Sequence, residues 1–325
     1  MARAHELLLP PALEPGDAIG IAAPAGAVNR EEFERGVARL RELEFEPVYD
    51  ESIFARDLYF AGSVQRRVDE FHELLRSPQV KAIVFARGGY GSNYLLPQLD
   101  LDLIARHPKI LCGYSDLSTL LLYLHDRIGL VGFHGAMVAK DFAKLDGIHL
   151  DSFFAATSGR SAWNITRSDS PQLAPLREGE AEAKLYGGCL SLMVASLGTP
   201  YEIHTQDTIL FLEDVGEYPY RIDRMLMQLK FACKLDKVRG IVFGEMAGCS
   251  PHAGAEYSLN DVIVRVLADV HVPIAIGLRS GHVAEQNITL PIGVRARLSV
   301  RNEVRLDLLE SATVSRPQTS KAGQR

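Results

Sequence analysis

Short apolar segments alternate with amphipathic helical patterns along the first 134 residues, and this alternation constrains the fold more than any other feature of the chain. The segment VKAIVFA at 80–86 is almost continuously apolar, which is typical of a strand covered on both faces. Elsewhere hydrophobic residues recur at helical spacing, as in Phe33, Val37 and Leu40. The alternation predicts a doubly wound α/β domain with a parallel sheet. Its expected strands are 17–23, 45–50, 80–86, 109–112 and 130–133.

A second α/β domain is expected after a polar stretch in the middle of the chain. Residues 161–183 are rich in Ser, Pro and charged residues, so we expect them to link an N-terminal domain, 13–160, to a C-terminal domain, 184–313. The C-terminal domain combines helical patterns with alternating segments at 295–309 that are typical of antiparallel strands, which predicts a mixed sheet. We expect residues 314–325 to form a disordered tail.

Composition excludes several classes of protein. The chain has 325 residues, of which 47% are hydrophobic and 23% charged, as in ordinary globular proteins. Its net charge of −6 argues against a nucleic-acid partner, because phosphate contacts need a basic face. No apolar run reaches the roughly 18 residues of a transmembrane helix, and the N-terminus does not resemble a signal peptide, so we expect no membrane partner. Four widely spaced cysteines predict reduced thiols in a cytoplasmic protein.

A serine stands where a predicted strand meets a predicted helix. The segment ILC leads into GYSD, and helical spacing begins directly after Asp116. This is the setting of a nucleophile elbow, in which the Ser115 hydroxyl is exposed and the N–H of Asp116 stabilises an oxyanion. Leu117 replaces the final glycine of the usual G-x-S-x-G pattern. The alternative is a serine that caps the helix.

The glycine turn RGGYG follows the predicted strand at 80–86. Glycines let backbone amides approach a ligand, so Gly88 or Gly89 is a candidate second oxyanion donor, with Arg87 and Tyr90 beside the site. A tight structural turn is the alternative. The chain has no nucleotide-binding glycine pattern and no metal-ligand cluster, and we expect neither a cofactor nor a metal.

A nucleophilic serine needs a base, and the chain has ten histidines. His282 follows the apolar segment PIAIG and lies directly after Gly281, in a loop beyond a predicted strand. His134 also follows a predicted strand, and we expect it to line the site. For His282 the alternative is a loop histidine with a structural hydrogen bond.

The acid that orients such a base is expected at a strand end as well. The strand TILFL runs into Glu213, and Glu217 follows shortly after. A carboxylate in this place holds an imidazole N–H and stabilises the imidazolium. Both acids remain candidates, and the alternative for either is an ion pair with Arg221 or Arg224.

Taken together, these segments resemble the LD-carboxypeptidases of the Ser-Glu-His type, which include muramoyl-tetrapeptide carboxypeptidases and microcin C immunity peptidases. The blocks ARGGYG, GYSD and LED-x-x-E-x-x-Y-R-I-D-R are specific in combination. The similar segments fall in order between about residues 13 and 310; they lie at 16–26, 61–100, 110–121, 132–137, 186–200, 209–229 and 281–293.

The resemblance implies one role for each part of the site. The family's nucleophile falls on Ser115, its acid on Glu213 and its base on His282. Its oxyanion hole, formed by the glycine turn and the residue after the serine, falls on Gly88 or Gly89 and on Asp116.

Two positions qualify this assignment. Members often have Arg after GYG-x-x, where this chain has Asn93 and Tyr94. Glu217 also remains a rival to Glu213 for the acid.

The resemblance also implies architecture and function. We expect a catalytic cleft between an N-terminal domain that holds the serine and a C-terminal mixed-sheet domain that holds the acid and base, in a homodimer. The implied reaction is hydrolysis of the amide between an L-diamino acid and the terminal D-alanine of a murein tetrapeptide, in cytoplasmic peptidoglycan recycling. Arg87 is the expected partner of the substrate's terminal carboxylate.

Two rival functions stay open at this point. A microcin-immunity peptidase would cleave amides of peptidyl or aminoacyl nucleotides, and such a site needs an aromatic platform for the base. The only tryptophan, Trp163, lies in the expected linker, whereas Tyr90 or Tyr218 offers a flat ring. A non-catalytic α/β protein that binds a small molecule is the second rival.

Overall fold

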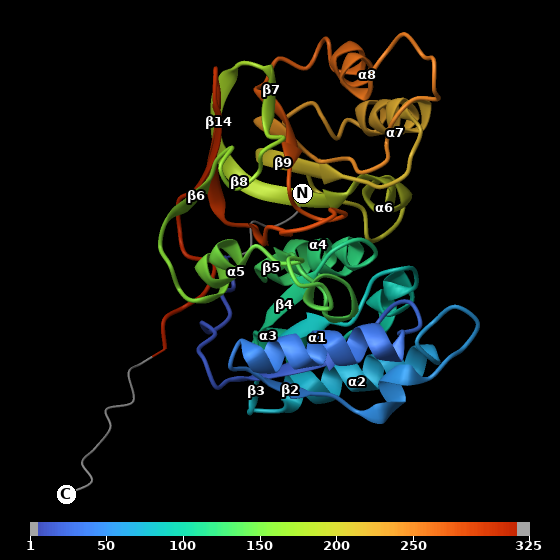
Figure 1. The fold of residues 1–325 in the computed structure, drawn as a ribbon, viewed down its shortest axis with the longest axis vertical. Coiled ribbons are helices and arrows are strands. Elements are labelled where there is room, and N and C mark those ends of the chain that lie inside the picture. Colours follow the sequence, from blue (N-terminus) through green and yellow to red (C-terminus); the bar gives the residue numbers. More distant parts are fainter. Residues whose placement is uncertain (1–5, 317–325) are drawn as a thin grey trace, which may run out of the picture.

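The computed structural model describes residues 6–316, which form two α/β domains stacked on one another (Figure 1). The lower domain in that view has a six-stranded sheet, and the upper domain has an eight-stranded sheet. The predicted fold class, with a mostly parallel N-terminal sheet and a mixed C-terminal sheet, is confirmed. Within residues 6–316, no helix combines the length and hydrophobicity needed to cross a bilayer.

The N-terminal sheet has the strand order β12-β5-β4-β3-β1-β2. Its five N-terminal strands are parallel, as expected from buried apolar segments separated by helices. They are β1 Ala18–Ala22, β2 Glu46–Val48, β3 Val80–Phe85, β4 Ile110–Gly113 and β5 Gly132–His134. The sixth strand, β12 (Leu290–Ile292), comes from the C-terminal part of the chain and pairs antiparallel with β5.

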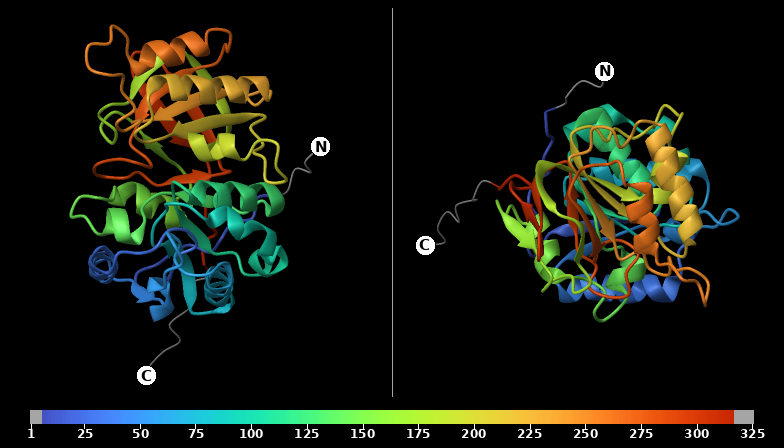
Figure 2. Two further views of the ribbon diagram at one scale, coloured as in Figure 1. Left: turned by 90° about the vertical axis from the view of Figure 1, so that its right-hand side faces the viewer. Right: turned by 90° about the horizontal axis from the view of Figure 1, so that it is seen from above.

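Helices flank this sheet (Figure 2), and all of them except α4 begin at a side-chain cap that the sequence supplies. Asn29 accepts a hydrogen bond from the N–H of Glu32, and Ser63 accepts one from the N–H of Arg66. The helices are α1 Arg30–Glu42, α2 Val64–Arg76, α3 Leu101–Arg106, α4 Leu117–Ile128 and α5 Leu150–Thr157. Between β3 and α3 the chain also forms two short 3₁₀ turns, η2 (Ser92–Tyr94) and η3 (Leu96–Gln98).

The C-terminal sheet has the order β6-β14-β13-β8-β9-β10-β11-β7. Its four central strands, β8 to β11, are parallel, and the outer pairs are antiparallel. The strands are β6 Trp163–Ile165, β7 Ala174–Arg177, β8 Gly179–Cys189, β9 Thr208–Glu213, β10 Gly240–Gly244, β11 Ile274–Leu278, β13 Arg295–Val300 and β14 Val304–Leu308. Its helices are α6 Leu190–Ala195, α7 Pro219–Phe231 and α8 Leu259–Val266.

The structure differs from the sequence-based domain boundaries at two places. Residues 161–183, expected as a linker, carry β6, β7 and the start of β8. β6 and β7 are edge strands, where polar residues and Pro175 are tolerated because one side of the strand is unpaired. In the expected tail, Val314 bridges to Pro11 and Arg316 donates to Asp17. The remainder of the expected tail, 317–325, lies outside the described residues.

The two sheets share a hydrophobic core. One buried cluster contains Phe133 of β5 and Phe211 of β9, together with residues from the first and last strands of the chain. β12 strengthens this connection, because the C-terminal part of the chain completes the N-terminal sheet through it. The carboxyl ends of β4 and β9 are thereby held at fixed positions across the domain boundary.

Candidate active site

Ser115 lies in the tight turn between β4 and α4. Its φ of 64° is in the left-handed region, which costs a non-glycine residue about 1–3 kcal/mol. The N–H of Leu117 donates to the carbonyl of Tyr114 at 3.3 Å, and that of Ser118 to the carbonyl of Ser115 at 2.9 Å, so the turn runs directly into the helix. A strained serine between a strand and a helix is the geometry of a nucleophile elbow, even though Leu117 replaces the final glycine.

A histidine and a glutamate from the other domain complete a hydrogen-bonded chain with this serine. His282 Nε2 lies 3.1 Å from Ser115 Oγ, and His282 Nδ1 lies 2.8 Å from Glu213 Oε2. Glu213 is the last residue of β9, and His282 lies in the loop after β11. Because the carboxylate accepts the proton of Nδ1, Nε2 of the neutral imidazole is left to accept the Ser115 hydroxyl.

Gly281 makes the close contact between this loop and Glu213 possible. Its φ is 95°, and a Cβ at this position would lie 2.6 Å from Glu213 Oε2. The backbone N–H of His282 also donates to that oxygen at 3.1 Å. Glycine therefore allows the loop to bring both the backbone and the ring of His282 onto one carboxylate.

The pKa values of the pair follow from burial and mutual charge. Burial would raise the pKa of Glu213, but the imidazole of His134, 3.8 Å away, and the hydrogen bond and charge of His282 hold the pKa at about 2. For His282, burial would lower the pKa, but the hydrogen bond and charge of Glu213 outweigh burial and raise it above its ordinary value. The carboxylate is thus ionised at neutral pH and stabilises the imidazolium that forms when His282 takes a proton.

The glycine turn faces the serine across the ends of β3 and β4. A Cβ at Gly88 would lie 3.0 Å from Ser115 Oγ and 3.4 Å from the backbone nitrogen of Asp116. The carbonyl of Gly88 accepts from the N–H of Gly26 at 3.2 Å. Across residues 6–316, no hydrogen bond uses the N–H of Gly88, Gly89 or Asp116. Unpaired amides next to a serine hydroxyl are the elements of an oxyanion hole.

The sequence predicts that His134 lines the site, but in the structure it does not. Its side chain is fully buried, with Nε2 3.8 Å from Glu213 Oε1 and Nδ1 3.1 Å from Ser280 Oγ. The reason is topological, because β5 lies between β4 and β12, beneath the domain boundary. His134 thus contacts the catalytic candidate Glu213 from behind and has no surface that a substrate could contact.

The remaining predicted residues lie in different surroundings. Glu217 is paired with Arg221 at 3.2 Å, whereas Glu213 holds His282, so only Glu213 has the position of the acid. Arg87 donates from Nη1 to the carbonyl of Ala27 at 3.1 Å. Tyr90 is 42% exposed. Its ring contacts three other rings, those of Tyr59, Phe60 and Tyr94.

Three residues near the site carried no recognisable sequence signal. Arg67 and Ser92 are fully buried beside the glycine turn, and Ser280 links His134 to the carbonyl of Ile288. Arg67 lies in a run of charged residues whose pattern is that of a solvated helix face. Its burial depends on a turn that reaches it from elsewhere in the chain.

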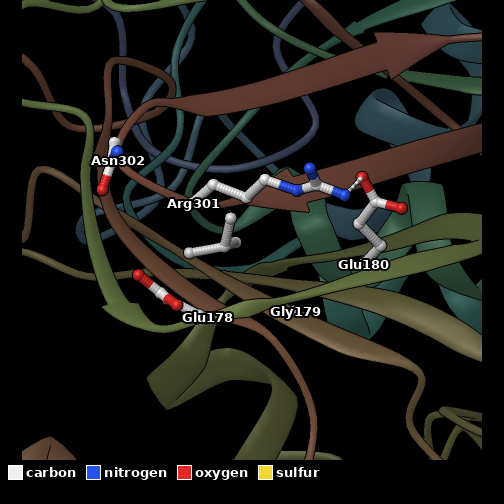
Figure 3. Close-up of a pocket in the computed structure, with 6 residues that line it drawn as sticks. Glu178, Gly179, Glu180, Arg301 and Asn302 are labelled. Atoms are coloured by element: carbon white, nitrogen blue, oxygen red, sulfur yellow. Dashed lines mark hydrogen bonds and ion pairs between the residues drawn. The ribbon is translucent and has the colours of Figure 1, made fainter.

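A cavity elsewhere on the surface lacks this convergence of a serine, a histidine and an acid. This cavity of about 600 Å³ is bordered by Glu178, Glu180, Arg301 and Asn302 (Figure 3), at the start of β8 and therefore at the opposite end of the sheet from Glu213. Its walls are exposed and held by the ion pair of Arg301 with Glu180. Among the residues that the structure describes, no three His, Cys, Asp or Glu side chains are grouped to hold a metal ion.

Comparison with known proteins decides the family. The model of the LD-carboxypeptidase N-terminal domain matches residues 19–135, and that of the LD-carboxypeptidase C-terminal domain matches residues 182–298. The probable murein peptide carboxypeptidase of Bacillus subtilis (strain 168) is 36% identical over 293 residues, which cover 89% of this chain and 91% of that protein. The chain belongs to the LD-carboxypeptidase family.

Other LD-carboxypeptidase relatives extend over nearly the same length. The murein tetrapeptide carboxypeptidase of Pseudomonas aeruginosa is 32% identical over 296 residues, which cover 86% of this chain and 92% of that protein. The solved structure of MccF in complex with glutamyl sulfamoyl guanosine has a TM-score of 0.86 and 26% identity, and covers 94% of this chain and 100% of that chain. The resemblance inferred from the sequence blocks is confirmed, and with it membership of a family of peptidases.

Proposed function

We propose that this protein is a serine LD-carboxypeptidase that hydrolyses the amide between the L-diamino acid and the terminal D-alanine of murein tetrapeptides. The observation that carries the proposal is the chain of contacts from Ser115 Oγ to His282 Nε2 at 3.1 Å and from His282 Nδ1 to Glu213 Oε2 at 2.8 Å. A nucleophile, a base and an acid in this order are what acyl transfer to serine requires.

In the acylation step, Ser115 attacks the carbonyl carbon of the scissile amide. Its proton passes to His282 Nε2, and the carbonyl electron pair moves onto oxygen, where the N–H groups of Asp116 and of Gly88 or Gly89 bind it. Glu213 stabilises the imidazolium through Nδ1. When the tetrahedral intermediate collapses, the C–N bond breaks and the imidazolium gives its proton to the departing amine of D-alanine.

Deacylation repeats these transfers with water as the nucleophile. His282 takes a proton from the water, the hydroxide attacks the acyl ester of Ser115, and the serine leaves with the proton from His282. The product is a tripeptide with a new carboxylate. Glu213 remains ionised throughout because its pKa of about 2 lies far below neutral pH.

A carboxypeptidase must also bind the free carboxylate of its substrate. Arg87 directly precedes Gly88, and its Nη1 is held by the carbonyl of Ala27. Its Nη2 makes no hydrogen bond within residues 6–316 and is our candidate for the carboxylate contact. Arginine suits this task because its planar guanidinium matches a carboxylate.

Murein tetrapeptide as the substrate is supported by the name of the Pseudomonas aeruginosa relative, a murein tetrapeptide carboxypeptidase. The name of the Bacillus subtilis relative supports a murein peptide more generally. A cytoplasmic role in peptidoglycan recycling and a homodimeric assembly belong to the same proposal. The test is to incubate the purified protein with a murein tetrapeptide and measure free D-alanine. We expect release by the wild type and none above background by Ser115→Ala. Equal release by both proteins would refute the serine mechanism.

A second candidate is hydrolysis of an aminoacyl nucleotide analogue. It is favoured by the likeness to MccF, whose solved structure is a complex with glutamyl sulfamoyl guanosine, and by a stack of rings near Glu217. The ring of Tyr218 stacks on that of Tyr220 with centroids 6.0 Å apart. The centroid of the Tyr218 ring lies 4.4 Å from that of the His252 ring. Trp163 is buried in β6 and offers no platform. Cleavage of such an analogue, without cleavage of the tetrapeptide, would establish this candidate instead.

A third possibility is a non-catalytic binding protein, which a binding measurement alongside the turnover assay distinguishes from the two peptidases. Such a protein would bind a peptide or a nucleotide without changing it. We therefore measure binding of both compounds to Ser115→Ala by calorimetry alongside turnover by the wild type. Binding without turnover by the wild type would favour a binding protein, in which the triad has only a structural role.

A further inference from the structure

Arg67 is a charged side chain in the interior for which the proposed reaction has no direct use. It projects from α2, is fully buried and is among the largest fully buried side chains of residues 6–316. Nη1 donates to the carbonyl of Pro24 at 2.6 Å and to that of Gly91 at 2.8 Å. The guanidinium carbon lies 4.8 Å from the ring centroid of Phe60. Burying a charge is costly unless it is paired, so these contacts call for an explanation.

The two carbonyls belong to segments that hold the two ends of the glycine turn. Gly26, two residues after Pro24, donates its N–H to the carbonyl of Gly88. At the other end, Gly91 has a φ of 127°, and a Cβ there would lie 2.8 Å from Arg67 Nη1 and 2.7 Å from the Phe60 ring. Arg67 is therefore bonded directly to one end of the turn 88–91, at Gly91, and is connected to the other end through the segment 24–26.

The same contact reaches the serine elbow. The peptide unit that joins Gly91 to Ser92 accepts from Arg67 through its carbonyl and donates through its N–H to Asp116 Oδ2 at 2.7 Å. Ser92 Oγ in turn donates to the carbonyl of Asp116 at 2.7 Å. Through one peptide plane, Arg67 is connected to the residue whose own N–H faces Ser115.

We propose that Arg67 is a positioning residue that holds the glycine turn and the serine elbow at the separation an oxyanion requires. The inference rests on the proposed function, since it assumes that Ser115 is the nucleophile. Arginine fits because one nitrogen reaches two carbonyls while the flat group packs on Phe60. Lysine ends one bond short of Nη1 and has no planar group to pack on Phe60, so it does not reproduce this arrangement.

Arg67→Lys tests the proposal, with Arg66→Lys as the matched control. Arg66 is the neighbouring arginine on α2; it is bonded to Glu70 at 2.8 Å and to the carbonyl of Ala23 at 3.1 Å. Within residues 6–316 it makes no hydrogen bond to residues 88–92, so it lacks the contact with Gly91 that distinguishes Arg67. Two quantities are measured: kcat and KM for the tetrapeptide, and the rate at which a fluorophosphonate modifies Ser115. In that modification Ser115 Oγ bonds to phosphorus, fluoride leaves and His282 takes the proton, while the phosphoryl oxygen occupies the oxyanion site.

We expect Arg67→Lys to lower both kcat and the modification rate by about 10²-fold, the size of an oxyanion-donor loss, with KM within about 2-fold of the wild type. Arg66→Lys should leave all three within about 2-fold. An unchanged modification rate in Arg67→Lys overturns the inference. An equal loss in Arg66→Lys also overturns it, because general destabilisation would then explain the data.

Failure of the proposed function gives a different pattern. If the wild type releases no D-alanine but Ser115 is modified, and Arg67→Lys slows that modification, the substrate is wrong and the role of Arg67 stands. If the wild type is neither active nor modified at Ser115, both proposals fall. Arg67→Met serves as a second variant, and near-ultraviolet circular dichroism establishes that each protein is folded. A folded Arg67→Met protein with wild-type modification also overturns the inference.

Discussion

The two domains contribute different things to the candidate active site. The N-terminal domain supplies backbone geometry: Ser115 has a φ of 64° and Gly89 a φ of 107°. The N–H groups of Gly88, Gly89 and Asp116 make no hydrogen bond within residues 6–316. The C-terminal domain supplies charge, through Glu213 with a pKa of about 2 and His282 with a raised pKa. The N-terminal domain thus sets the positions of the nucleophile and the backbone amides, and the C-terminal domain sets the protonation states of the acid and the base.

This division has a physical basis in the two kinds of strand end. β3 and β4 end in turns where small residues and a strained φ let amides and a hydroxyl approach a reacting atom. β9 ends in a buried carboxylate that is tolerated because two imidazoles face it. Substitutions in the N-terminal turns should therefore change rates without moving pH profiles, whereas substitutions of the acid should change both.

The largest expected effect is the loss of the nucleophile. Ser115→Ala removes the atom that forms the acyl-enzyme, and we expect kcat to fall about 10⁶-fold, as for a serine in a triad that acts as a unit. Tetrapeptide binding, measured by calorimetry, should stay within a few fold. A residual rate within about 10-fold of the wild type would show that the N-terminal domain does not carry the nucleophile.

Glu213→Gln is expected to have the next largest effect. The amide cannot hold His282 in the correct tautomer, so we expect kcat to fall about 10⁴-fold. The base acts in its neutral form, so activity is lost as the pH falls through the raised pKa of His282. Without the carboxylate, burial still lowers this pKa, and the acid limb of the kcat/KM profile should move to lower pH. An acid limb that stays at the same pH, or moves to higher pH, would contradict the conclusion that Glu213 of the C-terminal domain raises the pKa of His282.

Gly88→Ala tests the geometric side of the comparison. The added Cβ would lie 2.9 Å from the Cβ and 3.0 Å from Oγ of Ser115, and it would occupy the space next to the oxyanion site. We expect kcat to fall about 10²–10³-fold with an unmoved pH profile. At Gly16 no atom lies within 4 Å of the added Cβ, but its φ of 86° strains an alanine, so Gly16→Ala should lose stability and retain wild-type kcat. A shift of the acid limb in Gly88→Ala would break the proposed division between geometry and charge.

Glu217→Gln should have the smallest effect. Glu217 pairs with Arg221 in a partly exposed contact, and such pairs contribute about 0–1 kcal/mol to stability. We expect kcat within about 3-fold of the wild type and a thermal unfolding temperature close to it. A fall in kcat comparable to that of Glu213→Gln would show that the acid has been assigned to the wrong residue.

The sequence was most informative where local pattern and chemistry coincide. Ser115 between a strand and a helix, Glu213 at a strand end and His282 after a glycine were predicted as one site, and the structure brings their side chains within hydrogen-bonding distance. The spacing of these residues along the chain does not predict that they meet. The prediction rests on the family blocks and on the rule that sites in parallel sheets lie beyond the carboxyl ends of the strands. That these residues act catalytically stays a prediction.

Features that depend on contacts distant in sequence were not predictable. Residues 161–183 have the composition of a linker, yet they carry the edge strands β6 and β7 and the start of the central strand β8. Pairing of β6 with β14 and of β7 with β11 compensates for the polar side chains of the edge strands. His134 follows an apolar segment, as residues at the end of a strand do. It is buried by contacts with Glu213 and β12, which are distant in sequence. For Arg67, burial follows from the position of Gly91 and Pro24, which no local window contains.

The most direct test of a site divided between two domains is to trap the covalent intermediate. Wild-type protein is mixed with murein tetrapeptide, quenched in acid within milliseconds and analysed by intact and peptide mass spectrometry. We expect the tripeptidyl group as an ester on Ser115 of the wild type, and no adduct within that time when Glu213 is replaced by Gln. Release of D-alanine without an adduct on Ser115 at any time, or with an adduct on another residue, would contradict the mechanism.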